Sequence, residues 1–251
     1  MSSGQNFASA ALFAVFALFA APTARAIVGP AHDGAPFGDR VVMVLTRGAE
    51  GSGFCTGIVL APRIVLTAAH CLSATADMVV HYRDPEGQPI LVAVAATSMH
   101  PLYRADAVKR RVVSIDVGLV ETATPLPERF RPAVLADGAA PAVGEAATVV
   151  GYGIGQEGKP KTGGALRVAE LQVRAPASEI LLWAADPAET GAGACSGDSG
   201  GPIFAGDGKT IVAIVAWTSG AKGHKCGEIT QGPLMAPLRD WIGSVMKRWA
   251  P

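Results

Sequence analysis

The sequence predicts an all-β fold, and three observations carry that prediction. Short apolar or alternating segments recur between Gly, Pro and Asp residues, which is the pattern of many short strands. Strands do not alternate with helices of about 10–15 residues, and no repeat of fixed period is present, which excludes a βαβ fold or a solenoid. Hydrophobic residues make up 49% of the 251 residues, enough to build a packed core.

The charge balance excludes two classes of partner. The chain has 21 Lys and Arg residues against 21 Asp and Glu residues, and it has no long basic run. Binding to nucleic acid or to an anionic membrane surface depends on a basic patch or stripe. We therefore expect no nucleic-acid partner, and no membrane partner once the N-terminal segment is removed.

The first 26 residues have the features of a secretory signal peptide. Residues 10–21 form an apolar run of 12 residues, too short to span a bilayer of about 30 Å as a helix. Ala24-Arg25-Ala26 has the small residues that a signal peptidase accepts, although no Lys or Arg precedes the apolar run. We expect cleavage before Ile27 and a chain that acts outside the cell or in a periplasm; an uncleaved anchor is the alternative.

Ten strand segments are expected in the mature chain: 41–46, 57–60, 63–67, 78–82, 90–95, 117–121, 147–152, 165–173, 202–204 and 211–217. Residues 125–132 are rich in proline and are expected to form an extended linker between the halves 27–124 and 133–235. One helix is expected in 236–251, where Pro237 suits a first helical turn and apolar residues recur at helical spacing: Leu238, Trp241, Ile242, Val245, Met246 and Trp249.

Candidate catalytic residues lie in three short motifs: Leu66-Thr-Ala-Ala-His-Cys71, Ser114-Ile-Asp-Val-Gly-Leu119 and Cys195-Ser-Gly-Asp-Ser-Gly-Gly-Pro202. A serine hydroxyl becomes a good nucleophile only when a base takes its proton. An imidazole at His70 would serve as that base, and a carboxylate at Asp116 would hold its tautomer. Ser199 would attack, and Gly197 would let its own amide and that of Ser199 converge on the oxyanion.

The sequence argues against two other kinds of site, an α/β-hydrolase nucleophile elbow and a zinc site. Gly197-Asp-Ser-Gly-Gly201 also fits the G-x-S-x-G elbow of α/β-hydrolases, but that fold needs an acid and a histidine after the nucleophile. Only His224 follows Ser199, without strand and helix units around it. The four cysteines show no C-x-x-C spacing, so no zinc site and no cofactor are expected. By themselves, four cysteines permit three disulfide pairings.

Taken in order, the three motifs resemble those of chymotrypsin/trypsin-type (S1) serine proteases, with "DVGL" where that family usually has "DIAL". The resemblance extends from Ile27-Val-Gly29 to Leu238-Arg-Asp-Trp-Ile242. It implies two antiparallel six-stranded β-barrels with a C-terminal helix, and an active site in the cleft between them. It also implies an endopeptidase that works through a His70/Asp116/Ser199 triad and an acyl-enzyme. Polypeptide substrates, protein protease inhibitors and a monomeric state follow as expectations.

The same resemblance pairs Cys55 with Cys71 and Cys195 with Cys226. Other bridges common in animal members have no cysteines here, which favours a bacterial member. In this family a freed N-terminal ammonium pairs with the carboxylate before the nucleophile, here Ile27 with Asp198. Because Ala26 rather than a basic residue precedes Ile27, removal of the signal peptide would itself produce the activating terminus.

The resemblance also locates the substrate pocket, at fixed offsets from Ser199 and from the strand that ends in Trp217, itself an expected substrate-binding residue. Gly193 lies six residues before Ser199, where trypsin-like members have Asp, so we expect no preference for Lys or Arg unless Glu228 reaches into the pocket. Thr218 and Thr230 fall at wall positions that are often glycine, which predicts a narrow pocket for small uncharged side chains. Ala216 replaces a serine that usually bonds to the catalytic carboxylate.

Two further functions are alternatives to a serine endopeptidase. One is a catalytically silent relative that serves as a binding protein, and the other is an acyl hydrolase of another type. The complete set of His70, Asp116, Ser199, Gly197 and Asp198 favours an active peptidase, because a silent relative would more often have lost one of them.

Overall fold

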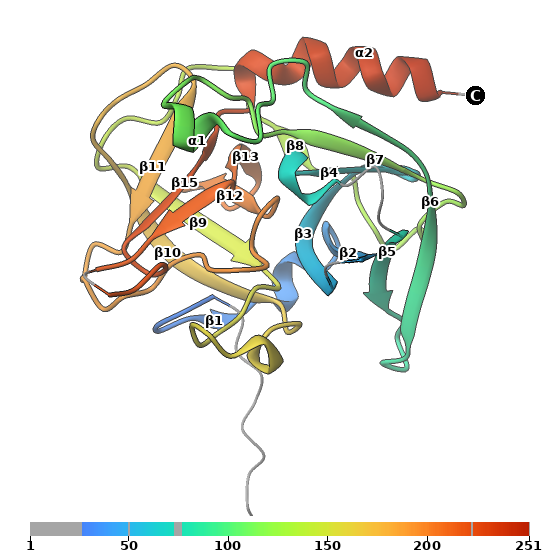
Figure 1. Ribbon diagram of the computed structural model, residues 1–251, viewed down its shortest axis with the longest axis horizontal. Coiled ribbons are helices and arrows are strands. Elements are labelled where there is room, and N and C mark those ends of the chain that lie inside the picture. The colour runs from blue at the N-terminus through green and yellow to red at the C-terminus, as the bar shows by residue number, and fades with distance from the viewer. Residues whose placement is uncertain (1–26, 50, 73–76, 222, 251) are drawn as a thin grey trace, which may run out of the picture.

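The structure is a computed structural model that describes residues 27–49, 51–72, 77–221 and 223–250. The expected signal peptide, residues 1–26, lies outside the described residues. In Figure 1 a barrel of strands lies on the right, a second group of strands lies on the left, and a helix runs across the top.

The first half forms a closed six-stranded barrel of antiparallel strands in the order β2-β3-β4-β7-β6-β5. The strands are β2 (Val41–Gly48), β3 (Gly51–Ala61), β4 (Ile64–Thr67), β5 (Asp77–Arg83), β6 (Pro89–Met99) and β7 (Gly118–Thr122). Valines dominate its core, with Val42, Val44, Val65, Val80 and Val120 all fully buried. β-branched side chains suit a pleated, buried surface, and one of the two expected barrels is thereby confirmed.

The second half forms a nine-stranded sheet in place of a second closed six-stranded barrel. Its strands are β1 (His32–Asp33), β8 (Val134–Leu135), β9 (Ala146–Gly151), β10 (Arg167–Arg174), β11 (Leu181–Ala185), β12 (Pro202–Ala205), β13 (Thr210–Ile214), β14 (Trp217–Ser219) and β15 (Ile229–Pro233). The order is β14-β15-β11-β10-β9-β12-β13-β8, with β1 on β10 and β8 parallel to β13. The sheet curls until a single bridge joins Ala213 to Leu234.

The strand expected at 211–217 is broken in two. This break is one reason why the second half has more strands than the six expected. β13 ends at Ile214 and β14 starts at Trp217. Between them the Val215 amide donates to Gly201 O at 2.8 Å, and the Ala216 amide donates to Gln231 O at 2.9 Å. The chain therefore changes its pairing partner at this point, beside the turn that carries Ser199.

Several short elements were not expected from the sequence. β1 and β8 have two residues each, too few to show a period, and α1 (Ala107–Arg110) is a single helical turn. β15 contains Gly232 and Pro233, which argue against a strand in a sequence pattern. The remaining short elements are one-turn helices: η1 (Ala35–Phe37), η2 (Ala69–Cys71), η3 (Pro160–Thr162) and η4 (Ala236–Leu238).

The expected C-terminal helix is confirmed as α2 (Arg239–Trp249). Ile242 and Val245 are buried, and Trp241 packs edge-on against the His100 ring at 4.9 Å. A single core cluster joins both β units and this helix, with members such as Ile58, Leu119, Phe204, Ile214 and Ile242. The helix therefore packs in the same core as both halves of the chain and stabilises their association.

The segment between the halves carries no strand. Leu126 and Phe130 are buried on the core of the first barrel, and the Leu126 amide donates to Pro62 O at 2.6 Å. No helix in the described part of the chain is long and apolar enough to cross a membrane.

Gly118 explains the departure from the usual "DIAL" motif and provides a test of the packing. A Cβ at this position would collide with the Leu72 side chain and would lie 3.3 Å from Ala69 Cα. We expect Gly118→Ala to lower the free energy of unfolding by about 1–3 kcal/mol, the usual cost of overpacking. Urea denaturation measures this change.

The matched control for that substitution is Gly243→Ala. Gly243 lies in α2, and a Cβ there meets nothing within 4 Å. Because alanine favours a helix over glycine by up to about 1 kcal/mol, this variant should be slightly stabilised. A Gly118→Ala variant as stable as the wild type would contradict the packing described.

Candidate active site

Strand pairing brings His70 and Asp116 to one edge of the first barrel. β4 and β7 are antiparallel neighbours, and Thr67 at the end of β4 lies opposite Gly118 at the start of β7. His70 lies in η2, three residues after Thr67, and Asp116 lies two residues before Gly118. Two residues far apart in the sequence therefore emerge side by side.

The carboxylate of Asp116 holds the imidazole of His70 by two contacts. Its Oδ2 lies 2.6 Å from Nδ1, and its Oδ1 accepts a hydrogen bond from the His70 backbone amide at 2.9 Å. An ionised carboxylate can only accept, so Nδ1 carries the proton and Nε2 is the basic nitrogen. The two side chains are 37% and 19% exposed, so the base can be reached from solvent.

Ser199 lies next to this pair through its backbone. Its carbonyl accepts a hydrogen bond from the Thr56 amide at 2.9 Å and lies 4.0 Å from Cys71 Sγ. Among the described residues there is no hydrogen bond between Ser199 Oγ and the His70 ring. Catalytic hydrogen bonds are often long before substrate binds, so this geometry is compatible with a nucleophile and its base.

The turn Ser196–Ser199, which we call the oxyanion turn, includes the two amides expected to bind an oxyanion, those of Gly197 and Ser199. All four of its carbonyls accept hydrogen bonds, at 2.8–2.9 Å. Ser196 O accepts from the Ile154 amide and Asp198 O from the Gly201 amide, while Gly197 O and Ser199 O accept from the hydroxyl and the amide of Thr56. No described group accepts from the amides of Gly197 and Ser199. In a trans peptide the N–H points away from the preceding carbonyl, so both donors are left available to an anion.

Glycine is required at Gly197. Its φ is +96°, in the region that residues with a Cβ rarely adopt. A Cβ there would collide with the Phe54 ring and would lie 2.9 Å from Gly153 Cα. Gly200 and Gly201 are packed as closely as Gly197. A Cβ on Gly200 would collide with the Thr67 side chain, and a Cβ on Gly201 would lie 2.5 Å from Val150 O.

Asp198 is a fully buried carboxylate within the oxyanion turn. Its oxygens accept hydrogen bonds from Gly153 N at 2.7 Å and Cys195 N at 2.9 Å. Burial raises the pKa of Asp198 to about 7, against the smaller lowering by these two amides. No described cation contacts this carboxylate.

The segment that starts at Ile27 is docked beside the expected pocket floor. Ile27 is fully buried, and Val28 forms an antiparallel bridge with Gly193 through hydrogen bonds of 3.1 and 3.2 Å. There is no hydrogen bond between Ile27 and Asp198 in the structure. The two expected members of an activation pair thus lie in the same region, but the pair itself is not formed here.

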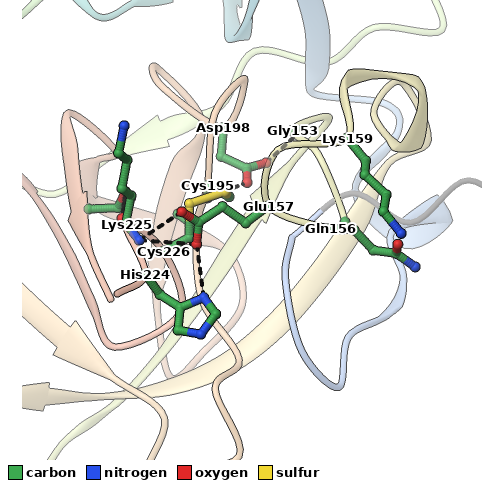
Figure 2. The surroundings of a disulfide bond; sticks show 12 residues. Gly153, Gln156, Glu157, Lys159, Cys195, Asp198, His224, Lys225 and Cys226 are labelled. Atoms are coloured by element: carbon green, nitrogen blue, oxygen red, sulfur yellow. Dashed lines mark hydrogen bonds and ion pairs between the residues drawn. A yellow bond between two sulfur atoms is a disulfide. The ribbon is translucent and has the colours of Figure 1, made fainter. Parts of the chain in front are cut away.

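Disulfides join Cys55 to Cys71 and Cys195 to Cys226, the pairing that the family resemblance implies. Figure 2 shows the second bridge, with Asp198 near it and Glu157 reaching to the loop that contains Cys226. The Glu157 carboxylate accepts from the Lys225 amide at 3.0 Å and lies 3.4 Å from His224 Nδ1. No sequence pattern pointed to Glu157, because loop contacts of this kind leave no periodic signal.

The expected pocket residues lie together, and their spacing is tight. Thr218 and Thr230 face each other across β14 and β15. Thr230 is buried and its Oγ1 accepts from the Ala194 amide at 3.0 Å, while Thr218 Oγ1 donates to Lys225 O at 3.0 Å. A Cβ on Gly193 would lie 3.2 Å from Gly227 Cα and 3.4 Å from Thr230 Oγ1, so there is little free space at this position.

A cleft of about 690 Å³ adjoins the His70 and Asp116 pair. It is lined by residues of both β units and of the 103–114 segment, among them Tyr103, Val112, Val113, Ala216 and Trp217. Val113 is 64% and Trp217 46% exposed, so part of the lining is apolar and open to solvent, beside charged residues such as Arg104 and Arg111. The 103–114 segment was not expected to contribute, although two adjacent valines in a polar loop were a signal that could have indicated it.

Ala216 has no hydroxyl with which to bond Asp116. Within the described part of the chain, Asp116 accepts two hydrogen bonds and both come from His70, one from the backbone and one from the ring. Cys55, His70 and Cys71 lie close enough to suggest a metal site, but both sulfur atoms are in a disulfide and offer no thiolate. The expectation of no metal site therefore stays a prediction.

The Trypsin family model matches residues 32–242. This chain belongs to the trypsin family. Trypsin eta of Drosophila erecta is 30% identical over 255 aligned residues, covering 93% of this trypsin-family chain and 94% of the relative. Human granzyme M is 26% identical over 225 residues, covering 80% of this chain and 82% of its own.

A solved structure of the same fold is a scabies mite inactivated protease paralogue. It is 24% identical, has a TM-score of 0.66, and covers 88% of this chain and 99% of its own. Membership of the trypsin family implies a second barrel, to which the curled nine-stranded sheet corresponds. The relatives reported are animal proteins, so the expectation of a bacterial source receives no support.

The buried carboxylate predicts a pH dependence of the full-length chain, in which a peptide bond precedes Ile27. The pKa of Asp198 is raised to about 7 in the folded state, above an unfolded value near 4. Its contribution to stability is therefore fully present below about pH 4 and is lost as the pH rises to about 7, by up to about 4 kcal/mol.

Urea unfolding at several pH values, with Asp198→Asn as the reference, measures this contribution. The difference in unfolding free energy between the two proteins should change with pH between about 4 and 7. A difference that stays constant over this range would contradict a raised pKa at Asp198.

Proposed function

We propose that the mature chain is a secreted serine endopeptidase that uses Ser199, His70 and Asp116. The observation that carries this proposal is the 2.6 Å contact between Asp116 and His70 Nδ1, beside a turn in which the amides of Gly197 and Ser199 have no acceptor among the described residues. A base whose second nitrogen is free, next to a serine and two oriented donors, is the arrangement that acyl transfer requires.

Each group then has a defined task. Ser199 Oγ attacks the carbonyl carbon of the scissile bond while His70 Nε2 takes its proton, and the amides of Gly197 and Ser199 stabilise the oxyanion. Collapse of the tetrahedral intermediate breaks the C–N bond, and His70 gives the proton to the leaving amine. Water repeats the sequence on the acyl-enzyme, while Asp116 keeps the imidazole oriented and stabilises its cationic form.

Signal-peptide removal would complete the site. Cleavage before Ile27 would free an ammonium at a residue that packs in one core cluster with Ala192 and Ala194, and its pairing with Asp198 would favour the ionised carboxylate. Two observations support this step: Ile27 is buried, and Val28 is already paired with Gly193. The mature enzyme would then need no separate zymogen cleavage.

The narrow surroundings of Gly193 support a preference for small uncharged side chains before the scissile bond. Thr230 Oγ1 lies near Gly193, and no acidic side chain replaces the Asp of trypsin-like members at this position. A pocket of this kind discriminates by about 1–3 kcal/mol per methylene, so the preference should be graded.

The disulfides bear on where the protein acts. Two disulfides in a trypsin-family chain are consistent with secretion. We propose polypeptide substrates, protein protease inhibitors as partners, and a monomer outside the cell or in a periplasm.

A catalytically silent relative that acts as a binding protein is the second candidate. Two observations favour it: Ser199 Oγ makes no hydrogen bond to His70 in the described structure, and Ala216 supplies no hydroxyl to Asp116. The inactivated scabies mite paralogue has a similar fold.

Digestion of a mixed peptide library by mature protein and by Ser199→Ala separates the two candidates. We expect cuts after Ala, Val and similar residues, and a loss of at least about 10³-fold in rate in the variant. Mass spectrometry identifies the cut sites. Absence of Ser199-dependent cutting, from protein shown to begin at Ile27, would favour the silent relative, whereas cuts after Lys or Arg would overturn only the pocket assignment.

Thr218→Gly tests the wall of the pocket. Removing this side chain should raise kcat/KM for substrates with Leu or Phe before the scissile bond about tenfold relative to Ala, because the entrance widens. Kinetics on matched peptide substrates measure the ratio. Thr210→Gly is the control: Thr210 is the half-buried first residue of β13, pairs with Val134 and is not among the expected pocket residues, so this change should leave the ratio unchanged.

A further inference from the structure

Thr56 is a buried polar residue that touches the oxyanion turn from the first barrel. It lies in β3, directly after Cys55, and its exposed fraction is 0%. Nothing in the three motifs singled it out. A hydroxyl in such a position is stable only when its donor and acceptor capacities are used.

Every polar group of Thr56 has a partner. Its Oγ1 donates to Gly197 O at 2.9 Å and accepts from the Tyr152 amide at 3.0 Å. Its amide donates to Ser199 O at 2.9 Å, and its carbonyl accepts from Thr67 Oγ1 at 2.8 Å. Two of the four partners are carbonyls of the oxyanion turn.

The position of Gly197 depends on these contacts. The peptide before Gly197 is fixed by the Ile154 amide, which donates to Ser196 O at 2.8 Å. The peptide after it is fixed by the Thr56 hydroxyl at Gly197 O. Because glycine has no Cβ, its backbone rotates more freely than that of any other residue, so the two hydrogen bonds set the φ of +96°.

The Gly197 N–H belongs to the peptide that the Ile154 bond fixes, whereas the Thr56 bond fixes the next peptide, which links this donor to the Ser199 N–H. If the carbonyl of Gly197 turned towards the cleft, the neighbouring peptides would rotate and the two free amides would no longer converge. A misaligned donor contributes little, since hydrogen bonds weaken steeply as their angle falls. Thr56 is therefore placed to orient the donors without touching a substrate.

We infer that Thr56 is a positioning residue for the oxyanion hole, acting through its hydroxyl on Gly197 and through its amide on Ser199. This inference rests on the proposed peptidase function. The oxyanion hole, whose donors belong to the second β unit, would thus also depend on a side chain of the first barrel. That side chain lies on β3, the strand that also carries Cys55.

Three variants test the role of the hydroxyl. Thr56→Val keeps the volume and removes the hydroxyl, Thr56→Ser keeps the hydroxyl, and Thr122→Val is the control. Thr122 is also fully buried and donates to a backbone carbonyl, Thr124 O, at 2.8 Å, but it lies at the far end of β7 from Asp116. The control reports the effect of losing a buried hydroxyl elsewhere in the same barrel.

We expect Thr56→Val to lower kcat about 10- to 100-fold with KM within about twofold, less than the loss of a whole oxyanion donor. The affinity for a peptide aldehyde, which forms a tetrahedral adduct, should fall in parallel. Thr56→Ser should retain kcat within about threefold, and Thr122→Val should lose stability without losing kcat. Equal kcat in Thr56→Val and the control would overturn the inference.

Crystal structures of the wild type, Thr56→Val and Thr56→Ser give a readout that needs no activity. The inference expects the Gly197 carbonyl to turn in Thr56→Val and to stay in place in Thr56→Ser; an unmoved carbonyl in Thr56→Val would overturn it. A wild type without Ser199-dependent cutting would defeat the proposed function, and these structures would still decide the role of Thr56. If Thr56→Val does not fold, Thr56→Ala serves in both measurements.

Discussion

The oxyanion turn is held by hydrogen bonds from both β units, and this constraint organises the rest of the site. Its carbonyls are bound by Ile154 and Gly201 from the second unit and by Thr56 from the first. Because all four carbonyls of the turn are hydrogen-bonded, the peptide planes are fixed, and the amides of Gly197 and Ser199 are left without an acceptor among the described residues. The two β units must therefore pack in one arrangement, which the shared core cluster and α2 enforce.

Close packing explains the glycines around this turn. A Cβ at Gly197, Gly200 or Gly201 would meet Phe54, Thr67 or Val150 at distances that real side chains do not adopt. The same reasoning applies at Gly118, where Leu72 fills the space that an alanine would need. Glycines therefore allow both the oxyanion turn and the segment around His70 to pack closely against their neighbours.

Burial of Asp198 connects this turn to the N-terminal segment. A carboxylate without a cation in an apolar interior prefers to be neutral, which is why its pKa is raised. An ammonium at Ile27 would reverse that preference. The fold therefore contains an electrostatic cost at Asp198, and the proposed cleavage before Ile27 would remove it by supplying a cation.

The sequence by itself determined the β class, the six strands of the first barrel, the C-terminal helix and the motifs that mark family membership, because these depend on local periodicity and short spacing. Tertiary structure alone decided which residues meet. The break between β13 and β14, the curled sheet in place of a closed second barrel, and the contacts of Glu157 depend on partners distant in the sequence. Thr56 is the clearest case, since a threonine in a strand has no local feature that reveals a hydrogen bond to a glycine 141 residues away.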